Sequence, residues 1–190
     1  MEKTLEQQAG KTANEQVKTL VMTALFAAMA CVATMVIHVP SPTGGYMNLG
    51  DTIVLLGAYF LGPVYGAVAG GVGSAMADLL SGYPVYVPAT LVIKAIMAIV
   101  AALLFRALGR RGVPGVLVCA VAGEVPMVIG YWFFDAWLAS GGQNFAASLA
   151  GSAVGIPSNL VQAGFGIAVS TLLLLALRKS SAMRRAFPRI

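Results

Sequence analysis

Charged residues are scarce in this 190-residue sequence. Asp, Glu, Lys and Arg make up 10% of the chain, against roughly 25% in a typical soluble domain, while 58% of the residues are hydrophobic. This composition excludes an ordinary soluble domain and is typical of a membrane protein. The net charge of +5 comes from cations that flank apolar runs, without interleaved aromatic residues, so it does not indicate nucleic-acid binding.

Cysteine and histidine are also rare. Cys31 and Cys119 lie inside apolar runs without a CxxC spacing, and the single histidine, His38, has no partner residue at metal-ligand spacing. A structural disulfide or a metal site is therefore not expected. The sequence contains no GxxxxGK[ST] loop, GxSxG elbow or HExxH helix. We therefore expect neither catalysis nor a cofactor bound by this chain.

The cations that are present follow a regular pattern. Eleven of the twelve Lys and Arg residues fall in three short blocks, at 3–18, 106–111 and 178–189. Such blocks mark the cytoplasmic side of a protein that crosses the membrane several times. If 51–80 crossed the membrane only once, the blocks could not share one side, so this stretch is predicted to hold two short spans.

The predicted fold is an all-α bundle of six transmembrane helices in the cell membrane, with both termini cytoplasmic. A polar segment at 1–18, which lacks a signal-peptide core, precedes a transmembrane domain at 19–178 and a basic tail at 179–190. The last span is expected to bend at Pro157. The predicted spans lie near residues 19–38, 51–62, 65–80, 87–107, 114–134 and 151–177.

Small residues are concentrated in two of these spans. The third span carries four glycines at 66–73, which permit close approach of neighbouring helices. The first span carries a strip of alanines that includes Ala24 and Ala28. Packing within the monomer and docking of another membrane subunit both account for this strip.

Aromatic residues gather toward the predicted outer face. Beside the acids Asp51, Asp78 and Asp135 and the cation Lys94, they predict an aromatic-lined pocket for a small molecule. A one-sided aromatic belt with structural ion pairs is the alternative. The outer aromatic residues are Tyr46, Tyr83, Tyr86, Tyr131, Trp132 and Trp137.

Several polar residues lie within the predicted spans. Lys94 is the only cation outside the basic blocks, and Asp78 is the partner that the sequence suggests for it, in a structural or a ligand-binding pair. Glu124 lies two residues before Pro126. Three roles are open for it: a protonated group that packs inside the bundle, a residue at a subunit interface, or a ligand contact. Asn159 and Gln162 share a helix face, either for interhelical hydrogen bonds or to recognise the edge of a heteroaromatic ring.

The order of several short motifs resembles the substrate-binding S components of energy-coupling factor (ECF) vitamin transporters, most closely the hydroxymethylpyrimidine or pyridoxine branch. The resemblance covers nearly the whole chain after residue 19. Its motifs are Asn48-Leu-Gly-Asp51, Leu61-Gly-Pro63, the run from Ala77-Asp78 to Tyr83, Pro88-Ala89-Thr90 followed by Lys94, Gly130-Tyr131, and Pro157-x-Asn159-x-x-Gln162.

The resemblance implies a vitamin site near the outer face, capped by the loop at 39–50. It also implies an AxxxA motif on the first helix that docks on a membrane coupling subunit, and Ala24-Leu-Phe-Ala-Ala28 matches that motif. Two partner ATPases are expected to drive the coupling subunit with ATP. Together with the polar and aromatic residues above, it predicts these substrate-binding residues: Asn48, Asp51, Asp78, Tyr83, Tyr86, Lys94, Tyr131, Trp132, Asn159 and Gln162.

The charge of the predicted pocket bears on its ligand. Three outer acids against one lysine favour a neutral or amine-bearing heteroaromatic compound over a polyanion, so we predict a pyrimidine or pyridine vitamin or precursor. A self-sufficient secondary transporter is the first alternative, although the halves of the sequence show no clear repeat. A membrane assembly factor or enzyme is the second alternative.

Overall fold

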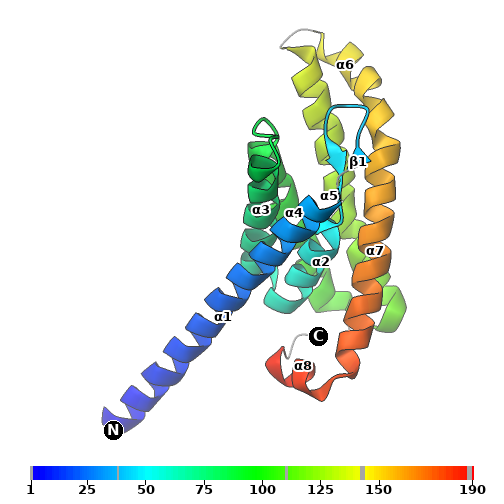
Figure 1. Cartoon of the computed structure of the whole chain (residues 1–190). Coiled ribbons are helices and arrows are strands. Elements are labelled where there is room, and N and C mark those ends of the chain that lie inside the picture. The colour runs from blue at the N-terminus through cyan, green and yellow to red at the C-terminus, as the bar shows by residue number, and fades with distance from the viewer. Residues whose placement is uncertain (1, 38, 110, 142–143, 188–189) are drawn as a thin grey trace.

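A computed structural model describes residues 2–37, 39–109, 111–141, 144–187 and 190, with side chains from residue 13 onward; His38 lies outside the described residues. The chain folds almost entirely into helices (Figure 1). Its elements are α1 (Glu2–Val36), β1 (Val39–Pro40), β2 (Tyr46–Met47), α2 (Gly50–Leu61), α3 (Pro63–Leu80), α4 (Val87–Leu108), α5 (Gly112–Ser140), α6 (Phe145–Ser152), the 3-10 turn η1 (Ala153–Gly155), α7 (Ile156–Lys179) and α8 (Ser181–Ala186).

Within the described residues, four apolar helical stretches are long enough to cross a membrane, at Ala13–Val36, Val87–Leu108, Gly112–Ser140 and Phe145–Lys179. The predicted all-α class is therefore confirmed. Five of the six predicted spans each fall on one helix, whereas the sixth, 151–177, covers the end of α6, η1 and most of α7. However, α2 has only 12 residues. At 1.5 Å per residue it is about 18 Å long, which is short for a crossing of roughly 30 Å. Six complete crossings stay a prediction.

The short helix α2 lies at the centre of the bundle, where it packs against α1, α3, α4 and α7. Its junction with α3 depends on Gly62, whose φ of 83° lies in the left-handed region that glycine tolerates, and on Pro63, which starts α3. A Cβ on Gly66 would lie 2.8 Å from Ala58 Cα. The predicted close packing by the glycines of α3 is therefore confirmed for its contact with α2.

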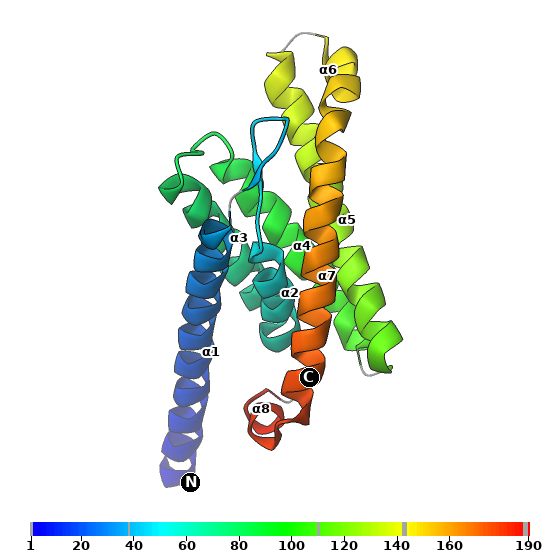
Figure 2. The same cartoon turned by 45° about the vertical axis from the view of Figure 1, so that its right-hand side comes forward.

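Both chain ends lie at one end of the bundle, and the β1–β2 hairpin and α6 lie toward the other (Figures 1 and 2). Basic side chains contribute contacts at the end that holds the termini. Lys18 donates to the carbonyl of Ala186 at 3.3 Å, and Arg178 donates to the carbonyl of Gly109 at 3.0 Å. This geometry agrees with basic blocks on one membrane side; that this side is the cytoplasm stays a prediction.

Three boundaries differ from the sequence prediction. Helix α1 already begins at Glu2, so the polar N-terminal segment continues the first apolar helix. Helix α5 continues to Ser140 despite Pro126 in its interior. The predicted last span is interrupted, because α6 begins at Phe145 and the chain passes through η1 just before Pro157 enters the first turn of α7.

Candidate functional site

A hollow lies beneath the β1–β2 hairpin, among the ends of α3, α4, α5 and α7. Its cavity volume is about 30 Å³. That space holds about two water molecules. The lining residues are Ser41, Thr43, Gly45, Tyr46, Asn48, Asp78, Tyr86, Thr90, Tyr131, Asp135, Asn159 and Gln162.

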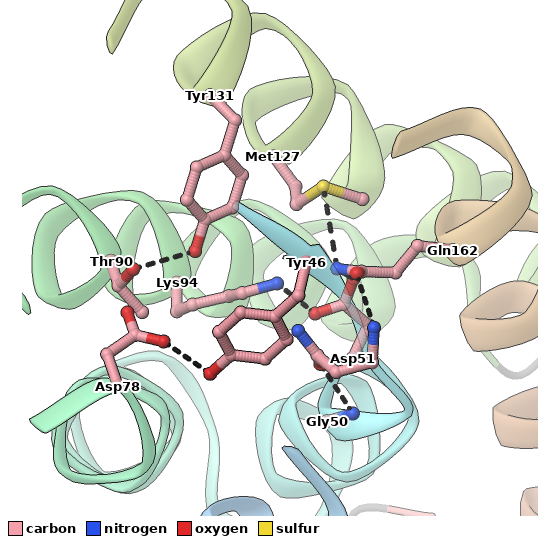
Figure 3. Close-up of polar contacts among 10 residues, drawn as sticks. Tyr46, Gly50, Asp51, Asp78, Thr90, Lys94, Met127, Tyr131 and Gln162 are labelled. Atoms are coloured by element: carbon pink, nitrogen blue, oxygen red, sulfur yellow. Dashed lines mark hydrogen bonds and ion pairs between the residues drawn. The ribbon is translucent and has the colours of Figure 1, made fainter. Parts of the chain in front are cut away.

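The hairpin forms the roof of this hollow and is tied to two helices. The Tyr46 hydroxyl donates to Asp78 Oδ1 on α3 at 2.5 Å (Figure 3), and the backbone N–H of Asn48 donates to Gln162 Oε1 on α7 at 2.8 Å. The turn between the strands is closed by the Ser41 N–H, which donates to the Gly45 carbonyl at 2.8 Å. The roof is therefore held at its second strand, next to the start of α2.

Two tyrosine–aspartate pairs flank the hollow. Beside the Tyr46–Asp78 pair, the Tyr86 hydroxyl donates to Asp135 Oδ1 at 3.0 Å. Burial and the bond to Asp78 raise the pKa of Tyr46, and burial together with the nearby Asp135 charge raises the pKa of Tyr86. Both phenols therefore keep their protons at neutral pH and act as donors to the carboxylates.

The floor of the hollow is a buried polar cluster. Lys94 on α4 forms an ion pair with Asp51 on α2, and Gln162 Nε2 donates to Asp51 Oδ2 at 2.7 Å (Figure 3). Lys94 Nζ also lies 5.4 Å from the centre of the Tyr131 ring, within cation–π range. The Tyr131 hydroxyl is 2.9 Å from that of Thr90. The charge of Lys94 is thus compensated beneath the hollow.

The family of the chain follows from its sequence. Residues 14–179 match the family described as the S component of an ECF-type riboflavin transporter. The chain belongs to this family. Its members are transporter subunits, which confirms the expectation that the chain is a transport protein and not an enzyme. The narrower hydroxymethylpyrimidine or pyridoxine assignment is not supported by this match and stays a prediction.

Two individual proteins are similar to this S component. The crystal structure of the S component for biotin from an ECF-type ABC transporter superposes with a TM-score of 0.60 at 19% identity, over 92% of this chain and 97% of that one, which shows a shared fold. An uncharacterized protein in a gap 3' region of Pyrococcus woesei is 40% identical over 101 residues, or 53% of this chain. The S component spans 66% of that relative, slightly under two thirds of its length.

The structure places the ten predicted binding residues of the S component in four settings. Asp51 and Lys94 lie directly beneath the hollow, and Tyr83 packs against the Tyr46 ring with centroids 4.7 Å apart. Trp132 does not line the hollow, because its indole N–H donates to the Leu149 carbonyl at 2.9 Å and joins α5 to α6. The six that line the hollow are Asn48, Asp78, Tyr86, Tyr131, Asn159 and Gln162.

The predicted partner of Lys94 was wrong. Its recorded ion pair is with Asp51, because α2 packs against α4 and brings the two residues together. Asp78, at the end of α3, instead accepts a hydrogen bond from Tyr46 in the roof. The acid that neutralises the lysine therefore comes from the central helix of the bundle.

Gln162 serves the interhelical role that was one of the two alternatives for it. Its carbonyl accepts from Asn48 and its amide nitrogen donates to Asp51, so both ends of the side chain bind protein groups. Asn159, which is half-buried and lines the same hollow, is the amide better placed to contact a ligand.

Sequence reasoning missed most of the roof. It treated 39–50 as a capping loop, whereas Val39 pairs with Met47 and Pro40 with Tyr46 in a short antiparallel ladder. The turn-forming residues Ser-Pro-Thr-Gly-Gly at 41–45 were the available signal for a hairpin. The lining residues absent from the predicted binding set are Ser41, Thr43, Gly45, Tyr46, Thr90 and Asp135, although Tyr46 and Asp135 had been placed at the predicted pocket.

One part of the alanine strip of α1 is buried inside the bundle, and another part is exposed on its surface. Ala30 is buried, and a Cβ on Gly73 of α3 would lie 2.9 Å from its Cβ, so this part of the strip packs within the monomer. Ala24 and Ala28 are exposed. The predicted docking motif thus lies on the outer surface of the bundle.

Proposed function

We propose that this S component captures a neutral, planar heteroaromatic vitamin in the hollow beneath the hairpin, for ATP-driven uptake by partner subunits. The observation that carries the proposal is the lining of the hollow. It combines three tyrosines with two aspartates and the amide of Asn159, above a lysine whose charge is already paired. Tyrosine rings supply flat apolar surfaces, and the polar groups fix the orientation of a ligand.

Riboflavin is the first ligand to test. The matched family is described by riboflavin transport. Riboflavin has a neutral fused ring with N–H and carbonyl groups along one edge and a chain of hydroxyl groups. Asp78 and Asp135 provide acceptors for such donors, and Asn159 provides both a donor and an acceptor. A pyrimidine or pyridine vitamin presents a similar ring edge in a smaller molecule.

The small free space implies that the roof moves when a ligand binds. About 30 Å³ is far below the roughly 300 Å³ or more of a typical ligand pocket. Among the bonds of the described residues, those from Tyr46 to Asp78 and from Asn48 to Gln162 hold the second strand, so both break when the hairpin opens and form again when it closes. We propose that the hairpin opens to admit the vitamin and then closes over it.

Uptake requires partners, because the sequence carries no phosphate-binding loop of its own. We propose that the exposed Ala24 and Ala28 of α1 dock on a membrane coupling subunit driven by two ATPases. Small exposed residues permit the close helix approach on which association within a membrane depends.

The test is a binding titration of the purified chain against riboflavin, hydroxymethylpyrimidine, pyridoxine and biotin. We expect one of the first three to bind at one molecule per chain, and Asp78→Asn and Asn159→Ala to weaken that binding. Uptake by the chain alone in liposomes would instead favour a self-sufficient secondary transporter. Failure of every compound to bind a folded chain would contradict the proposed function.

A further inference from the structure

A second acid lies beside the polar floor of the hollow without a visible donor. Glu124 on α5 is 2% exposed, and neither of its carboxyl oxygens has a hydrogen-bond partner among the described residues. A buried carboxylate without a donor or a cation is strongly disfavoured, and such a group is usually neutralised. The setting of Glu124 therefore needs an explanation.

Gly166 of α7 accounts for the position of Glu124. A Cβ at residue 166 would collide with Glu124 Oε1 and would lie 3.0 Å from Asp51 Cβ. The side chains of both acids thus share the space left by one glycine. A hydrogen bond between their carboxyl groups would satisfy an oxygen of Glu124. Such a bond requires a proton on one of them, because two carboxylates can only accept.

The charges around this pair do not balance unless a proton is present. Among the described residues, the titratable groups near Glu124 are Asp51 and Tyr59 of α2 and Lys94 of α4. On the side of α7, the adjoining residues are Gly166 and the uncharged Gln162. Lys94 compensates Asp51, so an ionised Glu124 would leave one net negative charge inside the bundle.

We propose that the floor of the hollow holds one buried proton, which Glu124 carries and donates to Asp51. The proton makes the group of Glu124, Asp51 and Lys94 neutral while Asp51 keeps its ion pair. Gln162 then links this neutral group to Asn48 at the base of the hairpin. The inference does not depend on which ligand the hollow binds.

Infrared spectroscopy of the purified full chain at neutral pH tests the proposal directly. A protonated carboxyl group has a carbonyl stretching band that a carboxylate lacks. We expect this band in the wild type, its loss in Glu124→Gln, and its retention in Glu15→Gln, a matched change at an exposed acid of α1. Absence of the band from the wild type, or its persistence in Glu124→Gln, would overturn the proposal.

The pH dependence of stability provides a second readout. The folded state would bind one more proton than the unfolded state above pH about 4.3, the ordinary titration point of glutamate. The wild-type folding constant should then fall about tenfold per pH unit from this contribution as the pH rises, until Glu124 loses its proton in the folded state. Glu124→Gln should lack this component, and Glu15→Gln should keep it.

A bound metal cation would be the competing explanation. Replacing sodium and potassium with choline at fixed pH should leave the thermal midpoint of the wild type unchanged. A midpoint that rises with sodium concentration, together with a missing infrared band, would assign the site to a cation and overturn the proton. If Glu124→Gln does not fold, the wild type alone still tests the proposal. Its carbonyl band should be present at neutral pH and disappear at high pH.

Discussion

Lys94 on α4 and Asp51 on α2 form an ion pair in which each side chain is only 1% exposed. Asp51 lies in the first turn of α2, where the helix dipole favours a negative charge. Gln162 adds a hydrogen bond from α7, so the pair joins three helices directly beneath the hollow.

Removal of either charge alone should destabilise the bundle. Lys94→Met leaves Asp51 buried without its cation, and Asp51→Asn leaves the lysine without its anion; each should cost about 3–5 kcal/mol of unfolding free energy. The double variant should lose much less than the sum, because neither charge is then stranded. Unfolding in detergent micelles measures all three, and additive losses would show that the pair is not coupled.

The hydroxyl of Tyr46 should contribute to ligand retention. Tyr46→Phe removes the hydrogen bond to Asp78 that holds the roof, and bonds to charged acceptors contribute about 1.5–3 kcal/mol. We therefore expect ligand affinity to fall about tenfold or more, measured by equilibrium titration. Tyr65→Phe, at the opposite end of α3, is the control and should leave affinity unchanged. Equal losses in both variants would argue against a role for the roof contact.

Gln162 and Asn159 should separate stability from recognition. Gln162→Ala breaks the links to Asn48 and Asp51, so it should lower both the thermal midpoint and the ligand affinity. Asn159→Ala should lower the ligand affinity. Its free energy of unfolding should stay within about 0.5 kcal/mol of the wild-type value, so the thermal midpoint should change little. Thermal unfolding with and without ligand gives both quantities. A stable Gln162→Ala variant that binds normally would contradict the assignment.

The docking role of α1 can be tested without disturbing the pocket. Ala28→Trp places a bulky ring on an exposed position, so the isolated chain should fold and bind ligand normally, whereas uptake by the assembled complex should be abolished. Met29→Trp is the matched control, because residue 29 is also exposed but points about 100° away around the helix. Normal uptake with Ala28→Trp would remove the docking hypothesis.

Most of the helices were predictable because their signals are local. Apolar length, basic flanks and the Gly62-Pro63 break located five of the six predicted segments on single helices. The break between α6 and α7 was displaced from Pro157 because proline restricts the residues before it and is itself tolerated in a first helical turn. The two-residue strands of the hairpin were too short to give an alternating pattern.

The binding residues were predictable in kind but not in pairing. Six of the ten predicted residues line the hollow. Their aromatic and amide side chains lie near the outer ends of the helices, and these ends come together around the hollow. The partner of Lys94 depends on which helices touch, and the sequence does not reveal that α2 occupies the centre of the bundle. Glu124 was left with three roles for the same reason, since its proximity to Asp51 depends on the missing side chain of Gly166.

The central claim is that this S component binds a planar heteroaromatic vitamin beneath the hairpin. Native mass spectrometry of the gently purified chain, followed by release and identification of any bound small molecule, tests it most directly. We predict a flavin, pyrimidine or pyridine vitamin at one molecule per chain, with reduced occupancy in Asp78→Asn. A folded chain that carries no such compound and is not stabilised by any vitamin in a thermal-shift panel would contradict the claim.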